Sequence, residues 1–241
     1  MPSRIVVLGD SLTFHGPERA EPLTDPRLWP NVCAAALEAQ VDVVARLGWT
    51  SRDAWWAVTK DPNLWSVLLP RADALVLAVG GMDHLPASLP TWLRESIPYV
   101  RPGRLRRQVR RAYRRASPAV IRASGGRLRV LPQQATDHYL TRVVEGVRWF
   151  RPGLAVVALS PPPYETPVYP SARHHASARD AAKAWADRTD VTLVDTDPIV
   201  RPHLRAGRNN PDGMHWGWEC HADIGRAVAR ALAAAEEGRR R

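Results

Sequence analysis

The hydrophobic pattern of the chain alternates short apolar runs with longer segments of mixed polarity. Five runs of four to six mostly apolar residues predict buried β-strands, at residues 5–8, 41–45, 74–79, 154–159 and 191–194. The segments between and after them have the length and spacing of helices, at residues 30–40, 51–60, 62–69, 133–150, 172–187 and 218–235. This alternation is typical of βαβ units, in which helices cover both faces of a mainly parallel sheet. We therefore expect one α/β domain over residues 1–241.

The composition is typical of a globular protein without a disulfide framework. Hydrophobic residues make up 45% of the 241 positions, as in a globular protein that buries a sizeable core. Cys33 and Cys220 are the two cysteines, too few for a disulfide framework or a cysteine-bound metal, and they predict free thiols in a reducing compartment. The longest apolar run, 74–79, is too short to cross a bilayer, and the first residues lack the apolar region of a signal peptide. We expect a cytoplasmic protein without a metal or a transmembrane segment.

The net charge is concentrated in one segment. The formal charge is +10, but residues 101–129 contain eleven arginines and no acidic residue, so the rest of the chain carries −1. Leu105, Val109, Ala112 and Ala116 recur there at helical spacing, which predicts a basic helical insertion or lid at 99–131. A solvated helix face, contact with an anionic membrane and non-specific nucleic-acid binding are alternatives. No nucleic-acid motif supports the last, so we expect no nucleic-acid partner.

Two short segments carry residues of nucleophilic catalysis. Ser11 directly follows the first predicted strand, at the edge of a parallel sheet where ligands bind. A serine hydroxyl needs a base to take its proton, and Asp212 lies three residues before His215, within reach of one ring nitrogen. Taken separately, each segment also fits an ordinary capping serine or loop histidine.

Together the motifs resemble the SGNH (GDSL) hydrolase superfamily. The matching blocks are Gly-Asp-Ser-Leu at 9–12, Gly48 after the second strand, Gly-Gly-Met-Asp at 80–83 and Asp212-x-x-His215. The resemblance implies a flavodoxin-like, three-layer α/β/α sandwich with a five-stranded, mainly parallel sheet. It also implies that Ser11 is the nucleophile, His215 the base and Asp212 the orienting carboxylate. The N–H groups of Ser11 and Gly48 would form the oxyanion hole. The chain departs at Met82, where the family has an asparagine donor and a thioether cannot donate.

A closer resemblance is to the actinobacterial diglucosylglycerate octanoyltransferase family, carried by residues 48–56, 80–86, 99–102 and 209–216. It implies transfer of octanoyl from octanoyl-CoA to a sugar hydroxyl of diglucosylglycerate, in methylglucose lipopolysaccharide biosynthesis, without a cofactor. The partners would be an acyl-CoA and a glucosylglycerate-type sugar acid. Trp49, Met82, Asp83 and Trp216 are predicted substrate contacts. The alternative is a carbohydrate esterase or thioesterase on the same triad, and the oligomeric state stays open.

Overall fold

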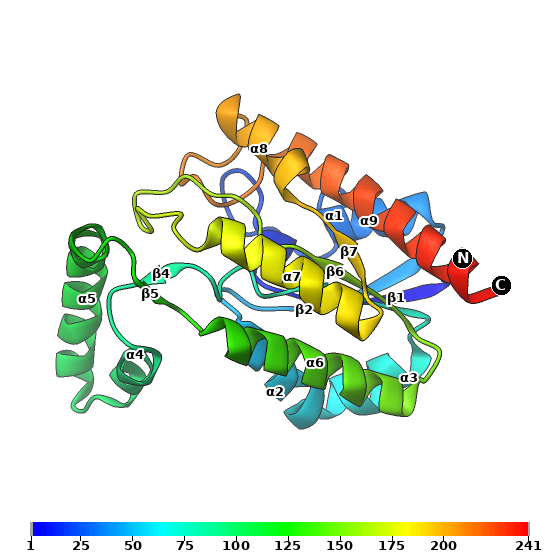
Figure 1. Ribbon diagram of the computed structural model, residues 1–241, viewed down its shortest axis with the longest axis horizontal. Helices are drawn as coiled ribbons and strands as arrows, with labels where there is room; N and C mark the ends of the chain where they lie inside the picture. Colours follow the sequence, from blue (N-terminus) through cyan, green and yellow to red (C-terminus); the bar gives the residue numbers. More distant parts are fainter. Residues whose placement is uncertain (1, 241) are drawn as a thin grey trace.

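A five-stranded parallel sheet forms the centre of the computed structural model, which describes residues 2–240 and the side chains up to residue 238; the outermost residues of the predicted domain, 1 and 241, lie outside it. The strands lie in the order β2-β1-β3-β6-β7 (Figure 1). Their bounds are β1 Arg4–Gly9, β2 Gln40–Ala45, β3 Ala74–Ala78, β6 Ala155–Leu159 and β7 Thr192–Val194. All neighbouring strands are parallel, as predicted from the continuous apolar runs.

Helices cover both faces of the sheet, which confirms the predicted α/β/α sandwich (Figure 1). One face packs against α2 Ser51–Lys60, α6 Gln133–Phe150 and α7 His175–Thr189. The other face packs against α1 Trp29–Ala36, α8 Asp197–Arg205 and α9 Trp218–Arg240. Alternate residues of β1 divide between the two cores, because successive side chains of a strand point to opposite faces.

The strand order creates a switch point beside β1. The chain passes from β1 to β2 on one side and then returns to place β3 on the other side of β1. The loops that leave the carboxyl ends of β1 and β3 therefore run in opposite directions, which opens a crevice where ligands bind in sheets of this type. The loop after β1 begins with a short 3-10 helix, η1 Ser11–Thr13.

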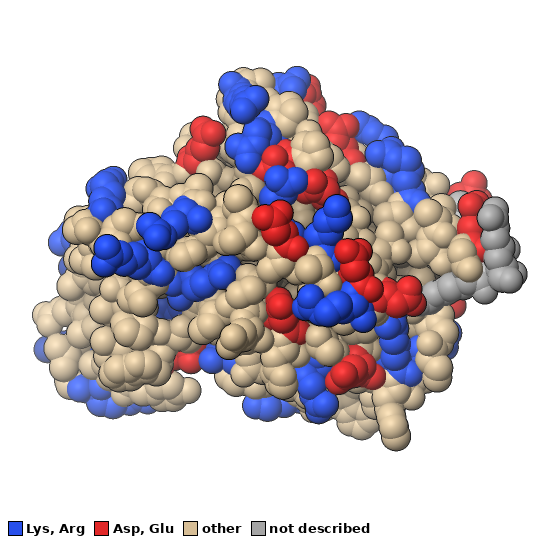
Figure 2. All heavy atoms as spheres, in the orientation of Figure 1, with Lys and Arg blue, Asp and Glu red and all other residues tan. Residues whose placement is uncertain are grey.

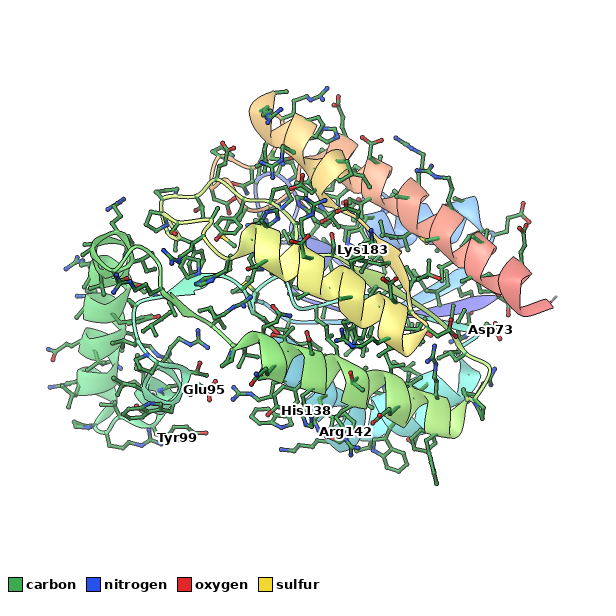
Figure 3. The ribbon with its side chains drawn as sticks, viewed as in Figure 1. Asp73, Glu95, Tyr99, His138, Arg142 and Lys183 are labelled. Carbon is green, nitrogen blue, oxygen red and sulfur yellow. The ribbon has the colours of Figure 1, made fainter. Side chains whose placement is uncertain are left out.

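An insertion separates β3 from α6. It contains β4 Pro86–Ala87, α4 Thr91–Ser96, the 3-10 helix η3 Ile97–Tyr99, α5 Gly103–Ala123 and β5 Leu128–Arg129. β4 and β5 pair antiparallel and close the neck of the insertion, so it starts earlier in the chain than the predicted segment 99–131. Figure 3 labels Glu95 and Tyr99 in this unit, to one side of the sandwich, and Glu95 forms an ion pair with Arg52 of α2.

The arginines of the insertion gather on α5. Eight of the 21 residues of α5 are arginine, and within the described residues none of these eight forms an ion pair. Figure 2 shows basic side chains over α5, whereas acidic and basic side chains are interspersed over the sandwich. The prediction of a basic helix in this segment is therefore confirmed; its function as a lid stays a prediction.

Several elements differ from the sequence prediction. The expected helix at 62–69 is present, but it has π-helical geometry at η2 Leu64–Leu68 and continues into the short α3 Leu69–Arg71. The expected helix at 30–40 ends at residue 36, because Glu38 takes a left-handed backbone conformation with φ 51°.

Both cysteines are buried free thiols. Within residues 2–240, no helix is long and apolar enough to span a bilayer, and no three His, Cys, Asp or Glu side chains are grouped to hold a metal ion.

Candidate active site

Ser11 lies at the carboxyl end of β1, on a tight turn. Gly9 is required there, because a Cβ at that position would lie 1.9 Å from Oγ1 of Thr13. Asp10 then caps η1 by accepting a hydrogen bond from the N–H of Leu12 at 2.9 Å. Burial raises the pKa of Asp10 to about 7, against the lowering effect of the Leu12 N–H, and the charge of Asp83 raises it further. This turn presents the Ser11 side chain at the switch point of the sheet.

The loop before α9 holds Asp212 and His215 in a fixed relation. Oδ1 of Asp212 accepts hydrogen bonds from the backbone N–H groups of Met214 at 2.8 Å and His215 at 3.0 Å. Oδ2 then lies 2.5 Å from Nδ1 of His215. Gly213 between them has φ 72°, and a Cβ there would lie 1.7 Å from the carbonyl oxygen of Glu165. Each carboxylate oxygen of Asp212 therefore has its own donors, so the orientation of the carboxylate is fixed.

The structure brings the three predicted catalytic residues into one hydrogen-bonded row, although Ser11 and His215 are 204 positions apart. Nε2 of His215 lies 3.0 Å from Oγ of Ser11. Because Nδ1 donates to Asp212, Nε2 is the acceptor and can take the hydroxyl proton of Ser11. The row can generate a nucleophilic alkoxide at the sheet edge.

The pKa values of the pair follow from its surroundings. Burial lowers the pKa of His215, Asp212 acts in the opposite direction, and the charge of His15 lowers it further. Burial raises the pKa of Asp212, but hydrogen bonds from the backbone N–H groups of His215 and Met214 and from the His215 ring bring it below its ordinary value. The base is therefore neutral and the carboxylate ionised near neutral pH.

His15 stacks on the catalytic imidazole and was not predicted from the sequence. The ring centroids of His15 and His215 are 3.8 Å apart and their planes differ by 20°. Nδ1 of His15 lies 2.8 Å from the carbonyl oxygen of Gly16, and the His15 carbonyl oxygen lies 3.1 Å from Nε2 of the buried His221. His15 therefore holds one face of the His215 ring. Only its position four residues after Ser11 could have marked it in the sequence.

The structure places the other predicted site residues in different settings. Gly48 follows β2 in an exposed turn with φ 73°, and nothing lies within 4 Å of a Cβ built there. The oxyanion-hole roles of the Ser11 and Gly48 N–H groups stay predictions. Met82 lies in the loop after β3, half-buried against an apolar cluster. Trp49 is also half-buried, and the guanidinium of Arg46 lies 5.7 Å from its ring centroid.

Asp83 and Trp216 lie inside the protein. Asp83 is 1% exposed and accepts hydrogen bonds from the Ser51 hydroxyl at 2.5 Å and the Thr136 hydroxyl at 2.9 Å, so it ties the loop after β3 to α2 and α6. Trp216 is also 1% exposed and belongs to the core between the sheet and α9. Both side chains are used in packing, and their predicted contacts with a substrate stay predictions.

Comparison with known proteins identifies the family. The sequence model of the GDSL-like Lipase/Acylhydrolase family matches residues 7–222. The chain belongs to this family. Two relatives are diglucosylglycerate octanoyltransferases: that of Mycolicibacterium hassiacum is 43% identical over 96% of this chain and 95% of its own length, and that of Mycobacterium tuberculosis is 40% identical over 96% and 92%. Both resemblances seen in the sequence are thereby confirmed.

Solved structures support the fold of the family member. A lipase/acylhydrolase from Enterococcus faecalis superposes with a TM-score of 0.62 at 14% identity, over 96% of this chain and 95% of the other. A carbohydrate acetylesterase family member from Sinorhizobium meliloti gives a TM-score of 0.61 at 16% identity, over 97% and 98%. At 14% and 16% identity, the likeness shows a shared fold and says nothing about activity.

Proposed function

We propose that the protein is a serine-dependent acyltransferase that moves an octanoyl group from octanoyl-CoA to a sugar hydroxyl of diglucosylglycerate, a step in the biosynthesis of methylglucose lipopolysaccharide. The observation that carries the proposal is the hydrogen-bonded row of Asp212, His215 and Ser11, in a chain that shares 40–43% of its residues with two octanoyltransferases over nearly its full length.

The first half-reaction forms an acyl-enzyme. Oγ of Ser11 attacks the thioester carbonyl carbon while Nε2 of His215 takes the hydroxyl proton. Asp212 stabilises the resulting imidazolium through Nδ1. The tetrahedral intermediate collapses with cleavage of the carbon–sulfur bond, and His215 returns the proton to the departing thiolate. The products are free CoA and an octanoyl ester on Ser11.

The second half-reaction uses the same groups in reverse. The acceptor hydroxyl gives its proton to Nε2 of His215 and attacks the ester carbonyl, and the proton then passes to Oγ of Ser11 as the new sugar ester leaves. The oxyanion of both steps would be held by the N–H groups of Ser11 and Gly48. Because Met82 cannot supply a third donor, these backbone groups carry that stabilisation, and loss of one such donor typically costs about 10²–10³ in rate.

The remaining requirements of this reaction are modest. The three side chains of the row and the backbone N–H groups of the oxyanion hole supply all of the proposed chemistry, so the proposal needs no metal or cofactor. The two buried thiols suit a reducing compartment, and we place the reaction in the cytoplasm. The unpaired arginines of α5 supply positive charge for the phosphates of CoA or the carboxylate of the acceptor.

A product analysis tests the proposal. Purified protein is incubated with octanoyl-CoA and diglucosylglycerate, and mass spectrometry measures octanoylated sugar and free octanoate. We expect the sugar ester to dominate, and Ser11→Ala to abolish both products. Ser66→Ala, which changes an exposed serine of η2, should keep transfer. Octanoate as the main product with acceptor present would indicate a thioesterase or carbohydrate esterase instead. Full transfer by Ser11→Ala would refute the acyl-serine mechanism.

A further inference from the structure

Met82 is the feature of the site that the proposed mechanism leaves unused. Its loop lies against the nucleophile's loop, because a Cβ built on the neighbouring Gly81 would be 3.7 Å from Oδ2 of Asp10 and 3.2 Å from Cδ of Pro162. The Met82 side chain turns to an apolar cluster formed by Leu85, Ala87, Val130, Leu131 and Tyr164. A position that could hold a polar donor thus adds apolar surface in a loop that lies against the loop of the nucleophile.

Two further side chains complete this surface from other loops. Met214 precedes His215, and Tyr169 lies in the loop after β6; both pack, half-buried, against the same cluster as Met82. We call Met82, Met214 and Tyr169 the apolar platform. Met214 joins the platform to the loop of the catalytic row, because its backbone N–H donates to Asp212 and it directly precedes His215.

The loops that carry the platform are locked together. The N–H of Glu165 donates to the carbonyl oxygen of Gly213 at 2.8 Å, which joins the loop after β6 to the loop of His215. The hydroxyl of Tyr164 donates to the carbonyl oxygen of Ser171 at 2.7 Å, so its ring faces the cluster while its polar end is satisfied. The platform is therefore formed in advance, and binding an apolar group there costs little ordering of the loops.

The far end of the platform leads to the insertion. Burial raises the pKa of Tyr169, the nearby Tyr113 of α5 raises it further, and Arg94 of α4 lowers it. The Tyr169 phenol is therefore neutral at physiological pH and lies in the field of residues from both helices of the insertion. Tyr169 therefore lies near both helices of the insertion.

We propose that Met82, Met214 and Tyr169 form the contact surface for the aliphatic chain of the acyl donor. The inference rests on the proposed function. Thioether side chains are flexible and polarisable and fit a linear alkyl chain without a polar group. Asparagine at position 82 would instead place an amide against this chain, with its hydrogen-bonding groups desolvated. The same substitution that removes an oxyanion donor therefore provides recognition of a longer acyl group.

The test uses a probe that reports on the platform independently of acyl transfer. The hydroxyl oxygen of Ser11 attacks the phosphorus of octyl and ethyl fluorophosphonates and fluoride leaves, and mass spectrometry follows the rate at which the Ser11 adduct forms. Each fully buried methylene changes binding by about fourfold, so we expect octyl to react at least about 30-fold faster than ethyl. Met82→Ala, Met214→Ala and Tyr169→Ala should each lower this octyl-to-ethyl ratio at least about threefold.

Val168→Ala is the matched control, because Val168 is apolar, adjacent to Tyr169 and 51% exposed. It should keep the wild-type ratio. An unchanged ratio in all three platform variants, with their thermal unfolding as in the wild type, would overturn the inference. So would a wild-type ratio near one. Absence of sugar acylation together with a high ratio that falls in the platform variants would overturn the proposed function and support the platform.

Discussion

Replacing Asp212 by asparagine tests whether its carboxylate selects the tautomer of His215. Oδ1 of Asp212 accepts from two backbone N–H groups, and Oδ2 accepts from Nδ1 of His215. In Asp212→Asn the amide oxygen retains the two backbone donors, so its NH₂ group faces Nδ1. The His215 proton must then move to Nε2, which can no longer accept the proton of Ser11.

The hydrogen bonds set the size of the effect. The opposite amide orientation would restore the active tautomer but lose both backbone hydrogen bonds, at about 1 to 1.5 kcal/mol each. That penalty of about 2–3 kcal/mol leaves one molecule in roughly 30 to 150 with the productive tautomer. The variant also lacks the charge that stabilises the imidazolium, so we expect kcat to fall by about 10³–10⁴.

The assay follows thiol release from octanoyl-CoA in the presence of acceptor. Asp223→Asn is the matched control, because Asp223 Oδ2 lies 2.8 Å from Nε2 of His203 in a second aspartate–histidine pair. The control should keep kcat within about twofold. Retention of more than a tenth of wild-type kcat by Asp212→Asn, with an unchanged unfolding transition, would refute the tautomer argument.

Three further predictions follow from the same geometry. The value of kcat/KM should rise with pH, with a midpoint below about 6.5, because the pKa of His215 is lowered and the base must be neutral. His15→Ala should move this midpoint to higher pH and lower kcat about 3–10-fold, because the variant removes the stacked ring and its charge. An unmoved midpoint would contradict the role of the stacked ring. Gly213→Ala should lower the free energy of unfolding, measured in urea, by more than about 2 kcal/mol. Gly125→Ala is the control and should cost much less, because Gly125 has a similar positive φ but no atom within 4 Å of a built Cβ. Equal losses in the two variants would show that the contact of Gly213 with the neighbouring loop is unimportant. Burial lowers the pKa of His84 to about 3, so the histidine is neutral in the folded protein and its contribution to stability falls as the pH drops below about 6.5. His84→Phe should therefore reduce the pH dependence of the free energy of unfolding by about 1.4 kcal/mol per pH unit between pH 6 and 4, measured by urea unfolding. An unchanged slope of stability against pH would contradict the buried, neutral histidine.

The sheet could be predicted because each of its strands is buried on both faces. Such strands read as continuous apolar runs bounded by polar loops, and the structure has all five of them in parallel pairs. The short elements of the insertion escaped prediction, because β4 and β5 contain two residues each and pair across 40 positions of intervening chain. Helix α8 escaped for another reason, since Pro198 and Pro202 interrupt its pattern.

The catalytic row could be predicted because its members lie in short motifs at strand ends. Ser11 follows a strand, and Asp212 and His215 are separated by one helical turn of sequence. The stacked His15 and the apolar platform could not be found this way. Their contacts join loops that are distant in sequence, and half-buried Met and Tyr side chains have no spacing that distinguishes a binding surface from a core.

The positive charge and the catalytic residues lie in different parts of the molecule, the insertion and the sandwich. Outside residues 101–129 the chain has a formal charge of −1, so Asp212 and His215 work in a nearly neutral sandwich where burial and a few hydrogen bonds set their pKa values. The eight arginines of α5 have no carboxylate partners among the described residues, and they lie on an insertion whose neck is closed by the pairing of β4 with β5. Under the proposed function, attraction of an anionic donor would fall to the insertion, where screening by salt weakens it, while the chemistry would depend on short contacts that salt barely affects. Phosphate recognition could then change without altering the pKa of the base.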